Sequence, residues 1–307
     1  MHTSLKVLDL FSGMGGFSYG FKKAGFEVTG LDSNVTATET YRKLTNGNGS
    51  TVDLYRESVG GNYAGIIGGP PCKPWSTVNL HRRKSQHKDY ELVNVFFQTV
   101  KKIQPEFFIM ENVPAIKNDP VIHDAIAKME HTGYRVVTGL YKYSDFGAAV
   151  ARKRFFIAGI MGRENEIFHE LEKKRKLEMT VFDAIWKFRK EPENALIDHE
   201  WPHLKTIRNY GKYYESGKYG WHQLVWKKPA PSFGNVMKTY TLHPEFGINS
   251  KEPRVISVLE SLRIMGFDGN PFPKGTAKGK RYQMIVDSVS PIFSNVLAET
   301  VYECIRG

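Results

Sequence analysis

The residue with the clearest chemistry is Cys72, which lies within Gly68-Gly69-Pro70-Pro71-Cys72-Lys73-Pro74-Trp75-Ser76. Proline interrupts helices and strand ladders, so this frame fixes a loop rather than placing the cysteine in a core. A thiol of ordinary pKa is only about 3% thiolate at pH 7, yet that fraction is a strong nucleophile, and Lys73 and Arg82-Arg83-Lys84 can raise it. We therefore predict that Cys72 is a nucleophile. Cys304, on an apolar helical pattern, is interpreted as structural.

A carboxylate and a pair of arginines also follow or begin buried-type segments. Glu111-Asn112-Val113-Pro114 follows the apolar run 107–110, and its side chain is expected at the same sheet edge as Cys72. A half-desolvated carboxyl there stays protonated near neutral pH and acts as a hydrogen-bond donor or general acid. The alternative is a strand-end acid that caps the next helix. Arg152-Lys153-Arg154 enters another apolar run, so at least one arginine is expected to face the site.

A glycine-rich turn, Asp9-Leu10-Phe11-Ser12-Gly13-Met14-Gly15-Gly16, joins a predicted strand to a predicted helix. Asp32 ends the next predicted strand, where a carboxylate can accept hydrogen bonds from ribose hydroxyls. The turn lacks the full dinucleotide fingerprint, so an adenosine cofactor without a pyrophosphate fits better than NAD. A glycine turn that only packs strand on helix is the alternative reading.

The elements that position these residues alternate between strand and helix in the first half of the chain. Strands are predicted at 6–11, 26–31, 64–67, 107–110, 135–141 and 154–160, with helices at 17–24, 92–103 and 121–131. This alternation indicates a mostly parallel sheet with helices on both faces. Residues 186–252 are rich in Trp, Tyr, Lys, Gly and Pro and predict a smaller, irregular or β-rich domain. Helical pattern returns at 253–265 and from about 291 to 304.

The composition restricts the partners and the compartment. The 307 residues carry a net charge of +11, which favours a polyanion such as nucleic acid. No apolar run reaches the length of a membrane span and the amino terminus shows no signal core, so we expect a cytoplasmic protein, nucleoid-associated if prokaryotic. Two distant cysteines make neither a disulfide framework nor a zinc cluster, and no metal is expected.

In this order the motifs resemble those of the cytosine-C5 DNA methyltransferases over nearly the whole chain. Pro70-Pro71-Cys72 resembles the nucleophile loop and Glu111-Asn112-Val113 the acid motif, a highly specific combination. Asp9–Gly16 resembles the cofactor loop and Arg152-Lys153-Arg154 the paired-arginine motif. Two later segments, Arg254–Gly266 and Asp287-Ser288-Val289, resemble the late helix and the closing motif.

The resemblance implies a Rossmann-like methyltransferase domain at 1–185 and 283–307, using S-adenosylmethionine, and a smaller β-rich target-recognition domain at 186–282. It implies that Cys72 adds to C6 of a flipped cytosine in double-stranded DNA, assisted by Glu111, Arg152 and Arg154. The implied cofactor residues are Phe11, Ser12, Gly13, Gly15, Asp32, Ser33, Asp53, Leu54, Gly69, Pro71, Leu92 and Ser288. The expected DNA contacts are Lys73, Ser76, Arg82, Arg83, Lys84, Arg208, Lys212 and Lys238.

Three departures from the family pattern bear on activity. Val150 stands where the family usually has glutamine, Val286-Asp287 where it has Gly-Asn, and Asp89-Tyr90-Glu91 where an arginine is common. Two alternatives therefore stay open: a tRNA cytosine methyltransferase, although its Cys-Phe-Thr segment is missing, and a catalytically weakened homologue that only binds DNA. A monomer is expected, and a cognate restriction endonuclease is left open as a partner.

Overall fold

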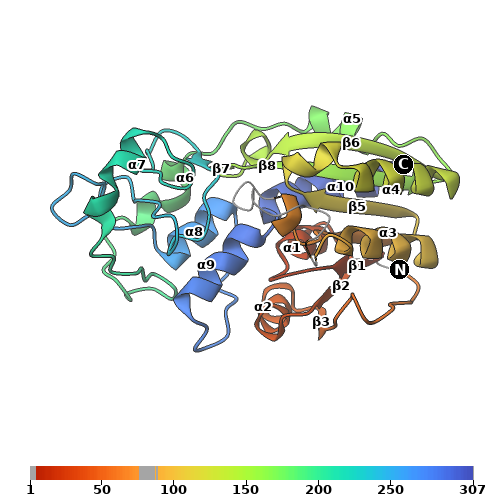
Figure 1. Cartoon of the computed structure of the whole chain (residues 1–307), viewed down its shortest axis with the longest axis horizontal. Helices are drawn as coiled ribbons and strands as arrows, with labels where there is room; N and C mark the ends of the chain where they lie inside the picture. The colour runs from red at the N-terminus through yellow and green to blue at the C-terminus, as the bar shows by residue number, and fades with distance from the viewer. Residues whose placement is uncertain (1–4, 76–86, 88, 307) are drawn as a thin grey trace. The chain divides into compact units, whose positions relative to one another are not determined.

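The computed structural model describes residues 5–75, 87 and 89–306. The chain forms two compact units (Figure 1). The sheet unit comprises Met1–Tyr141, Lys153–Arg175 and Ser294–Gly307. The second unit comprises Lys142–Arg152 and Lys176–Phe293.

The sheet unit is built on a mostly parallel sheet of seven strands in the order β3-β2-β1-β4-β5-β8-β6. Strands β3, β2, β1, β4 and β5 pair in parallel, whereas β8 is antiparallel to β5. No crossover helix separates β6 from β8, and a parallel return needs such a connection, so the chain reverses there. The strands are β1 (Lys6–Leu10), β2 (Glu27–Asp32), β3 (Asn48–Thr51), β4 (Gly65–Gly68), β5 (Phe107–Asn112), β6 (Tyr134–Lys142) and β8 (Lys153–Met161).

Helices cover both faces of this sheet, as the sequence predicted (Figure 1). Helices α3 and α4 enclose one core, in which Phe96, Phe97 and Phe108 are buried. Helix α1 packs against α10 so closely that a Cβ on Gly20 would lie 2.4 Å from the Asn295 nitrogen. None of the described helices is long and apolar enough to cross a membrane. The helices are α1 (Gly16–Lys23), α2 (Val35–Thr45), α3 (Leu92–Ile103), α4 (Pro120–His131), α5 (Ile167–Lys173) and α10 (Pro291–Arg306).

The strand order creates a topological switch point between β1 and β4. From β1 the chain continues to β2 and β3 on one side, and then returns to β4 and β5 on the other. In open α/β sheets, ligands bind beyond the carboxyl ends of the strands at such a point. The loops that follow β1 and β4 carry the glycine-rich turn and Cys72, so the topology assigns both to this edge.

The second unit is irregular rather than β-rich, so of the two forms that the sequence left open the irregular one is found, and the β-rich one is wrong. All of its residues are described, and its strands are limited to the short pair β7 (Val150–Ala151) and β9 (Ala230–Pro231). The Gly- and Pro-rich stretch forms an aromatic cluster in place of long strand ladders, with the rings of Tyr210 and Trp221 4.4 Å apart. The unit's helices are α6 (Val181–Ile185), α7 (Gly211–Glu215), α8 (Val258–Met265) and α9 (Lys278–Asp287), with 3-10 turns at Tyr143–Phe146, Trp186–Phe188 and Ile207–Tyr210.

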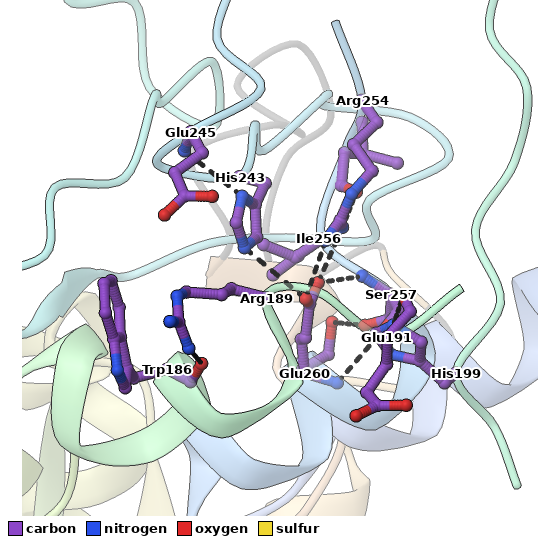
Figure 2. A network of polar contacts seen from close by, with 12 residues as sticks. Trp186, Arg189, Glu191, His199, His243, Glu245, Arg254, Ile256, Ser257 and Glu260 are labelled. Carbon is purple, nitrogen blue, oxygen red and sulfur yellow. Dashed lines mark hydrogen bonds and ion pairs between the residues drawn. The ribbon is translucent and has the colours of Figure 1, made fainter. Parts of the chain in front are cut away.

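A buried ion pair stabilises the interior of the second unit (Figure 2). Both carboxylate oxygens of Glu260 accept hydrogen bonds from the Arg254 guanidinium at 2.9 Å. One of these oxygens also accepts from the backbone nitrogen of Ser257, which caps α8. Burial opposes the charge on Glu260, but the Arg254 hydrogen bond and charge still hold its pKa below the usual range. Removing either partner would leave a buried charge uncompensated.

His243 completes this network as a neutral imidazole (Figure 2). Its Nδ1 accepts from the Glu245 backbone nitrogen at 3.2 Å, so the proton of the neutral ring is on Nε2, 3.5 Å from the Glu260 carboxylate. Burial lowers the pKa of His243 to about 4, against the opposing attraction of Glu260. The ring is therefore uncharged at neutral pH.

Candidate active site

The loop that carries Cys72 is attached to its surroundings on both sides of the cysteine. Before it, the carbonyl of Pro70 accepts a hydrogen bond from the Asn112 side chain at 3.0 Å. After it, the Trp75 backbone nitrogen donates to the Cys72 carbonyl at 3.0 Å, which closes the 3-10 turn Lys73–Trp75. Gly68 is required here, because a Cβ would lie 2.4 Å from the Leu10 carbonyl oxygen. The Cys72 side chain is half-buried.

Glu111 and Arg154 form an ion pair beside this loop. The Arg154 Nε lies 2.9 Å from the Glu111 Oε1, and the side chains are only 13% and 12% exposed. Antiparallel pairing of β5 with β8 brings the end of one strand and the start of the other to the same edge. A Cβ on Gly69 would be 3.0 Å from the Glu111 Oε2, so the glycine admits the carboxylate to the loop. The structure thus brings the Cys72 loop, Glu111 and Arg154 together.

This ion pair bears on the protonation expected for Glu111. Sequence reasoning considered burial alone, which favours a neutral carboxyl. The guanidinium at 2.9 Å favours the carboxylate form instead, because an adjacent opposite charge stabilises ionisation. The antiparallel β5–β8 pairing that creates the contact was not predictable from the two motifs.

Arg152 has a different environment from Arg154. It belongs to the second unit, is 7% exposed, and donates to the backbone carbonyls of Phe233 and Val286. Its own carbonyl accepts from the Tyr143 nitrogen. These contacts join separate segments of the second unit.

The glycine-rich turn after β1 is organised around Asp32. One Asp32 oxygen accepts from the Gly13 backbone nitrogen at 2.9 Å, and the other accepts from the Asn34 nitrogen at 2.8 Å. Phe11 and Gly13 have positive φ angles of 59° and 54°, so the backbone turns sharply at the strand end. The turn therefore presents its backbone, with the Asp32 carboxylate beside it.

This turn fits a nucleoside with a hydroxylated sugar. The Ser12 hydroxyl oxygen is buried and has no hydrogen-bond partner among the described residues, a state that a ligand donor or acceptor would relieve. A Cβ on Gly13 would meet no described heavy atom within 4 Å, so the turn has open space beside it. The structure thus favours a ligand site here over a glycine turn that only packs strand on helix.

The remaining residues expected at the cofactor are distributed unevenly. Leu54 is buried in the core beneath the strand ends, and Asp53 accepts from the Tyr55 nitrogen and pairs with Arg56 at 3.5 Å. Ser288 belongs to the second unit and donates to the Met284 carbonyl. The other expected residues that lie in the sheet unit are Gly15, Ser33, Gly69, Pro71 and Leu92.

A buried hydrogen-bonded chain below the turn was missed by the sequence reasoning. The Tyr41 hydroxyl donates to Ser18, whose hydroxyl donates to Asp9 at 2.7 Å. Burial, with a smaller contribution from the charge on Asp32, raises the pKa of Asp9 to about 7. An acidic residue at the end of an apolar strand was the only sequence signal, and Tyr41 belongs to a helix that the periodicity did not predict.

The expected DNA contacts fall into three groups. Ser76, Arg82, Arg83 and Lys84 lie outside the described residues. Lys73, Lys212 and Lys238 are exposed, and the Lys73 ammonium is 3.8 Å from Asp89. Arg208 is exposed but donates to the carbonyls of Ser250 and Lys251, so it also holds a loop of the second unit.

The sheet order, the turn after β1 and the cysteine loop after β4 define the class: a methyltransferase fold with a thiol and an ion-paired carboxylate at its ligand-binding edge. Comparison with known proteins specifies the family. The C-5 cytosine-specific DNA methylase profile matches residues 5–303, and the chain belongs to this family of S-adenosylmethionine-dependent enzymes.

Two relatives are matched along nearly their whole length. Type II methyltransferase M.FnuDI of Fusobacterium nucleatum is 28% identical, over 97% of this chain and 94% of the relative. Type II methyltransferase M.MthTI of Methanothermobacter thermautotrophicus is 27% identical, over 99% of both chains. Among solved structures, the methyltransferase EhMeth of Entamoeba histolytica shares the fold with a TM-score of 0.77 at 16% identity, covering all of both chains. The S. pombe Dnmt2 methyltransferase does so with a TM-score of 0.76 at 14% identity, covering 99% of this chain and all of that chain.

Proposed function

We propose that this protein methylates C5 of a flipped cytosine within a specific sequence of double-stranded DNA, through a covalent bond between Cys72 and C6. The observation that carries the proposal is the doubly attached Cys72 loop beside the Glu111–Arg154 ion pair. The names of its relatives favour a role as the modification enzyme of a restriction–modification system over tRNA methylation or DNA binding alone.

Cysteine addition solves the chemical problem of an unreactive C5. When the Cys72 thiolate forms a bond to C6, electron density moves to C5, and negative charge develops toward N3 and O2. S-adenosylmethionine would supply the electrophilic methyl group that C5 takes up; the methyl–sulfur bond breaks and S-adenosylhomocysteine is left. A base then removes the C5 proton, and the Cys72–C6 bond breaks to restore the aromatic ring and the thiolate. The base must leave the helical stack first, at a cost of about a few kcal/mol.

The Glu111–Arg154 pair is suited to the charge that develops on the ring. In our proposal the Arg154 guanidinium turns toward O2 of the entering base, where negative charge accumulates. Without its counter-charge, the Glu111 carboxylate would take up a proton from solvent and donate it to N3 as negative charge develops there. Arg152 is kept in the proposal as an assisting residue, and its guanidinium donates to the backbone carbonyls of Phe233 and Val286.

The cofactor residues form a second part of the proposal. Asp32 would accept from the ribose hydroxyls, Asp53 from the adenine amino group, and Phe11 and Leu54 would line the adenosine pocket. Ser12, Gly13, Gly15, Ser33, Gly69, Pro71, Leu92 and Ser288 would complete the site. The buried Ser12 hydroxyl and the open space at Gly13 support this assignment.

Target recognition is assigned to residues 186–282, and catalysis to 1–185 and 283–307. Exposed lysines of the first segment, Lys212 and Lys238, are suited to phosphate contacts, and Arg208 shapes the neighbouring loop. Lys73, Ser76, Arg82, Arg83 and Lys84 would contact DNA next to the nucleophile. Since each phosphate contact releases counterions, Lys212→Glu should weaken DNA binding and reduce its dependence on salt.

The decisive experiment measures transfer of tritiated methyl groups to duplex DNA and to tRNA. Wild-type protein should label DNA only, and Cys72→Ala should label neither. Cys304→Ala is the matched control, because Cys304 lies on α10 and should leave labelling intact. Persistent labelling by Cys72→Ala would exclude the covalent mechanism, and preferential labelling of tRNA would exclude DNA as the substrate. Bisulfite sequencing of DNA from expressing cells then gives the target sequence.

A further inference from the structure

The carboxylate of Asp119 joins three segments around the nucleophile loop. One oxygen accepts from the Trp75 indole Nε1 at 2.7 Å, and the other accepts from the Tyr90 hydroxyl at 2.6 Å and from the Val121 nitrogen at 3.2 Å. Asp119 and Trp75 are only 6% and 3% exposed. Such short hydrogen bonds to a buried carboxylate are stronger than neutral ones and fix the geometry of their donors.

The contact to Trp75 acts on the cysteine through the backbone. Trp75 ends the 3-10 turn in which its own nitrogen donates to the Cys72 carbonyl. Anchoring the indole therefore fixes the turn that follows the nucleophile. The aromatic rings of Trp75 and Tyr90 also contact each other, with centroids 5.3 Å apart.

Asp119 belongs to the same segment that carries the catalytic carboxylate. Glu111 and Asn112 end β5, one 3-10 turn (Pro114–Asn118) follows, and Asp119 then caps α4. Asn112 already binds the Pro70 carbonyl before Cys72. The segment 111–119 thus holds the nucleophile loop at two points, one before the cysteine and one after it.

Tyr90 is the additional donor that completes this arrangement. Its hydroxyl stays protonated, because burial and the hydrogen bond to Asp119 both raise its pKa. Asp89, the preceding residue, lies 3.8 Å from the Lys73 ammonium on the loop itself. Two neighbouring residues that precede α3 therefore contact the loop or its anchor, Asp89 through Lys73 and Tyr90 through Asp119.

We propose that Trp75, Asp119 and Tyr90 are positioning residues. They hold the Cys72 sulfur at the correct distance from C6 while Glu111 contacts the base. This inference rests on the proposed function, in which Cys72 is the nucleophile. The three side chains would act on the rate of bond formation and not on affinity for DNA or cofactor. A displacement of about 1 Å at a reacting atom can lower a rate by about 100-fold.

Three substitutions each remove one hydrogen-bond donor or the charge from the cluster. Tyr90→Phe removes only the hydroxyl, and Trp75→Phe removes the indole donor while keeping an aromatic ring. Asp119→Asn keeps an acceptor for the α4 cap but places an amide donor opposite one of the two other donors. Tyr134→Phe is the matched control: it removes a buried hydroxyl that donates to the Pro105 carbonyl at 2.7 Å, before β5 rather than after it.

The measurement is the single-turnover rate of covalent adduct formation on duplex DNA that carries 5-fluorocytosine at the target. The Cys72–C6 bond forms on this base. Because fluorine occupies C5, there is no C5 proton to remove, and the bond to Cys72 is not broken by that step. We expect each cluster variant to form adduct at least about 10-fold more slowly, with unchanged KM for DNA and cofactor. Tyr134→Phe should form adduct at the wild-type rate. Because Trp75 and Tyr90 both act through Asp119, their combined effect should be smaller than the product of the two.

The outcomes separate this inference from the function on which it rests. If wild-type protein forms no adduct, the proposed covalent mechanism fails. If wild-type protein forms adduct and the cluster variants match its rate, the mechanism holds and the positioning role is refuted. The positioning role is also refuted if the rates of the cluster variants fall only in proportion to their folded fraction. Thermal unfolding measures that fraction, with Tyr134→Phe measured in the same way as the control.

Discussion

Replacing Asp9 with asparagine is expected to stabilise the sheet unit at pH 8 and much less at pH 5. Asp9 is buried below the cofactor turn, where its carboxylate accepts from Ser18 at 2.7 Å. Burial raises its pKa from 3.8 to about 7. A carboxyl whose pKa is higher in the folded state favours folding at low pH, and that contribution is lost as the pH rises from 3.8 through 7. An asparagine presents an acceptor to Ser18 without a charge.

The size of the effect follows from the two pKa values. A raise of about three units at about 1.4 kcal/mol each gives at most about 4 kcal/mol at pH 8, where the folded protein must ionise Asp9. At pH 5 the folded protein keeps the proton on Asp9, and the pH is only about one unit above the pKa of the unfolded chain. The gain in stability therefore falls to about 1.5 kcal/mol. The difference between the two conditions is therefore about 100-fold in the equilibrium for opening.

Amide hydrogen exchange of β1 and β2 measures this opening locally in a protein of two units. Wild type and Asp9→Asn are compared at the same pH, so intrinsic exchange rates cancel. Protection of these strands should increase in the variant, by about 100-fold more at pH 8 than at pH 5. Glu39→Gln, which removes an exposed carboxylate of α2 in the same unit, should leave protection unchanged. Equal loss of protection in Asp9→Asn at both pH values would show that Asp9 is a stabilising charge, and the reasoning would be wrong.

Three further predictions concern stability. Arg254→Met should lower the free energy of unfolding of the second unit by about 3–5 kcal/mol, because Glu260 stays buried without its partner. Tryptophan fluorescence in urea measures this change, and a variant as stable as the wild type would contradict the prediction. Acidification from pH 6.5 to 4 should destabilise the same unit by up to about 3 kcal/mol, because His243 takes up a proton at higher pH in the unfolded chain than in the folded one. The urea midpoint of His243→Gln should vary less over this range than that of the wild type. Gly20→Ala should cost about 1–3 kcal/mol through its clash with Asn295, and unchanged exchange protection of α1 would refute the close packing.

The parallel half of the fold was predictable because its strands are buried on both faces and its helices are amphipathic. The predicted helix at 92–103 has the observed bounds of α3, and the strands differ by one or two residues. Helix α2 and strand β3 were missed for opposite reasons. Helix α2 contains several threonines, which weaken its helical pattern, and β3 is a polar edge strand whose neighbours fix its conformation.

The second unit was less predictable because its stability comes from contacts that are remote in sequence. An aromatic-rich, Gly- and Pro-rich stretch fits a β-rich domain equally well until its ring contacts are known. The Arg254–Glu260 pair is local and lies within the predicted late helical segment, but its buried neighbour His243 is not. Hydrophobic periodicity carries no information on such polar interiors.

The catalytic residues were predictable from strand ends, but the contacts that hold them were not. Cys72 and Glu111 each follow a strand of a parallel sheet, so topology alone brings them to one edge. The hydrogen bond from Trp75 to Asp119 spans 44 residues and has no periodic signature. The one local signal was Asp119 before Pro120, a helix start, and it gave no reason to connect that cap to the nucleophile.

The departures from the family pattern take on a structural meaning once these contacts are known. Val150 is buried and begins β7, where its pairing with Ala230 needs no polar side chain. The carbonyl of Val286 accepts from Arg152, and both oxygens of Asp287 accept from Gln283. These replacements are therefore integrated into the interior and helix surface of the second unit.

The arginine expected before Leu92 is absent, and Tyr90 in this segment donates instead to Asp119, which anchors the turn after Cys72. A cation in this segment would satisfy a carboxylate such as Asp119 by its charge. Here two neutral donors, the Tyr90 hydroxyl and the Trp75 indole, satisfy it by hydrogen bonds of 2.6 and 2.7 Å. Neutral donors do not lose strength with ionic screening as an exposed ion pair does. The anchoring of the Cys72 loop to Asp119 is therefore achieved in this chain without an arginine before Leu92.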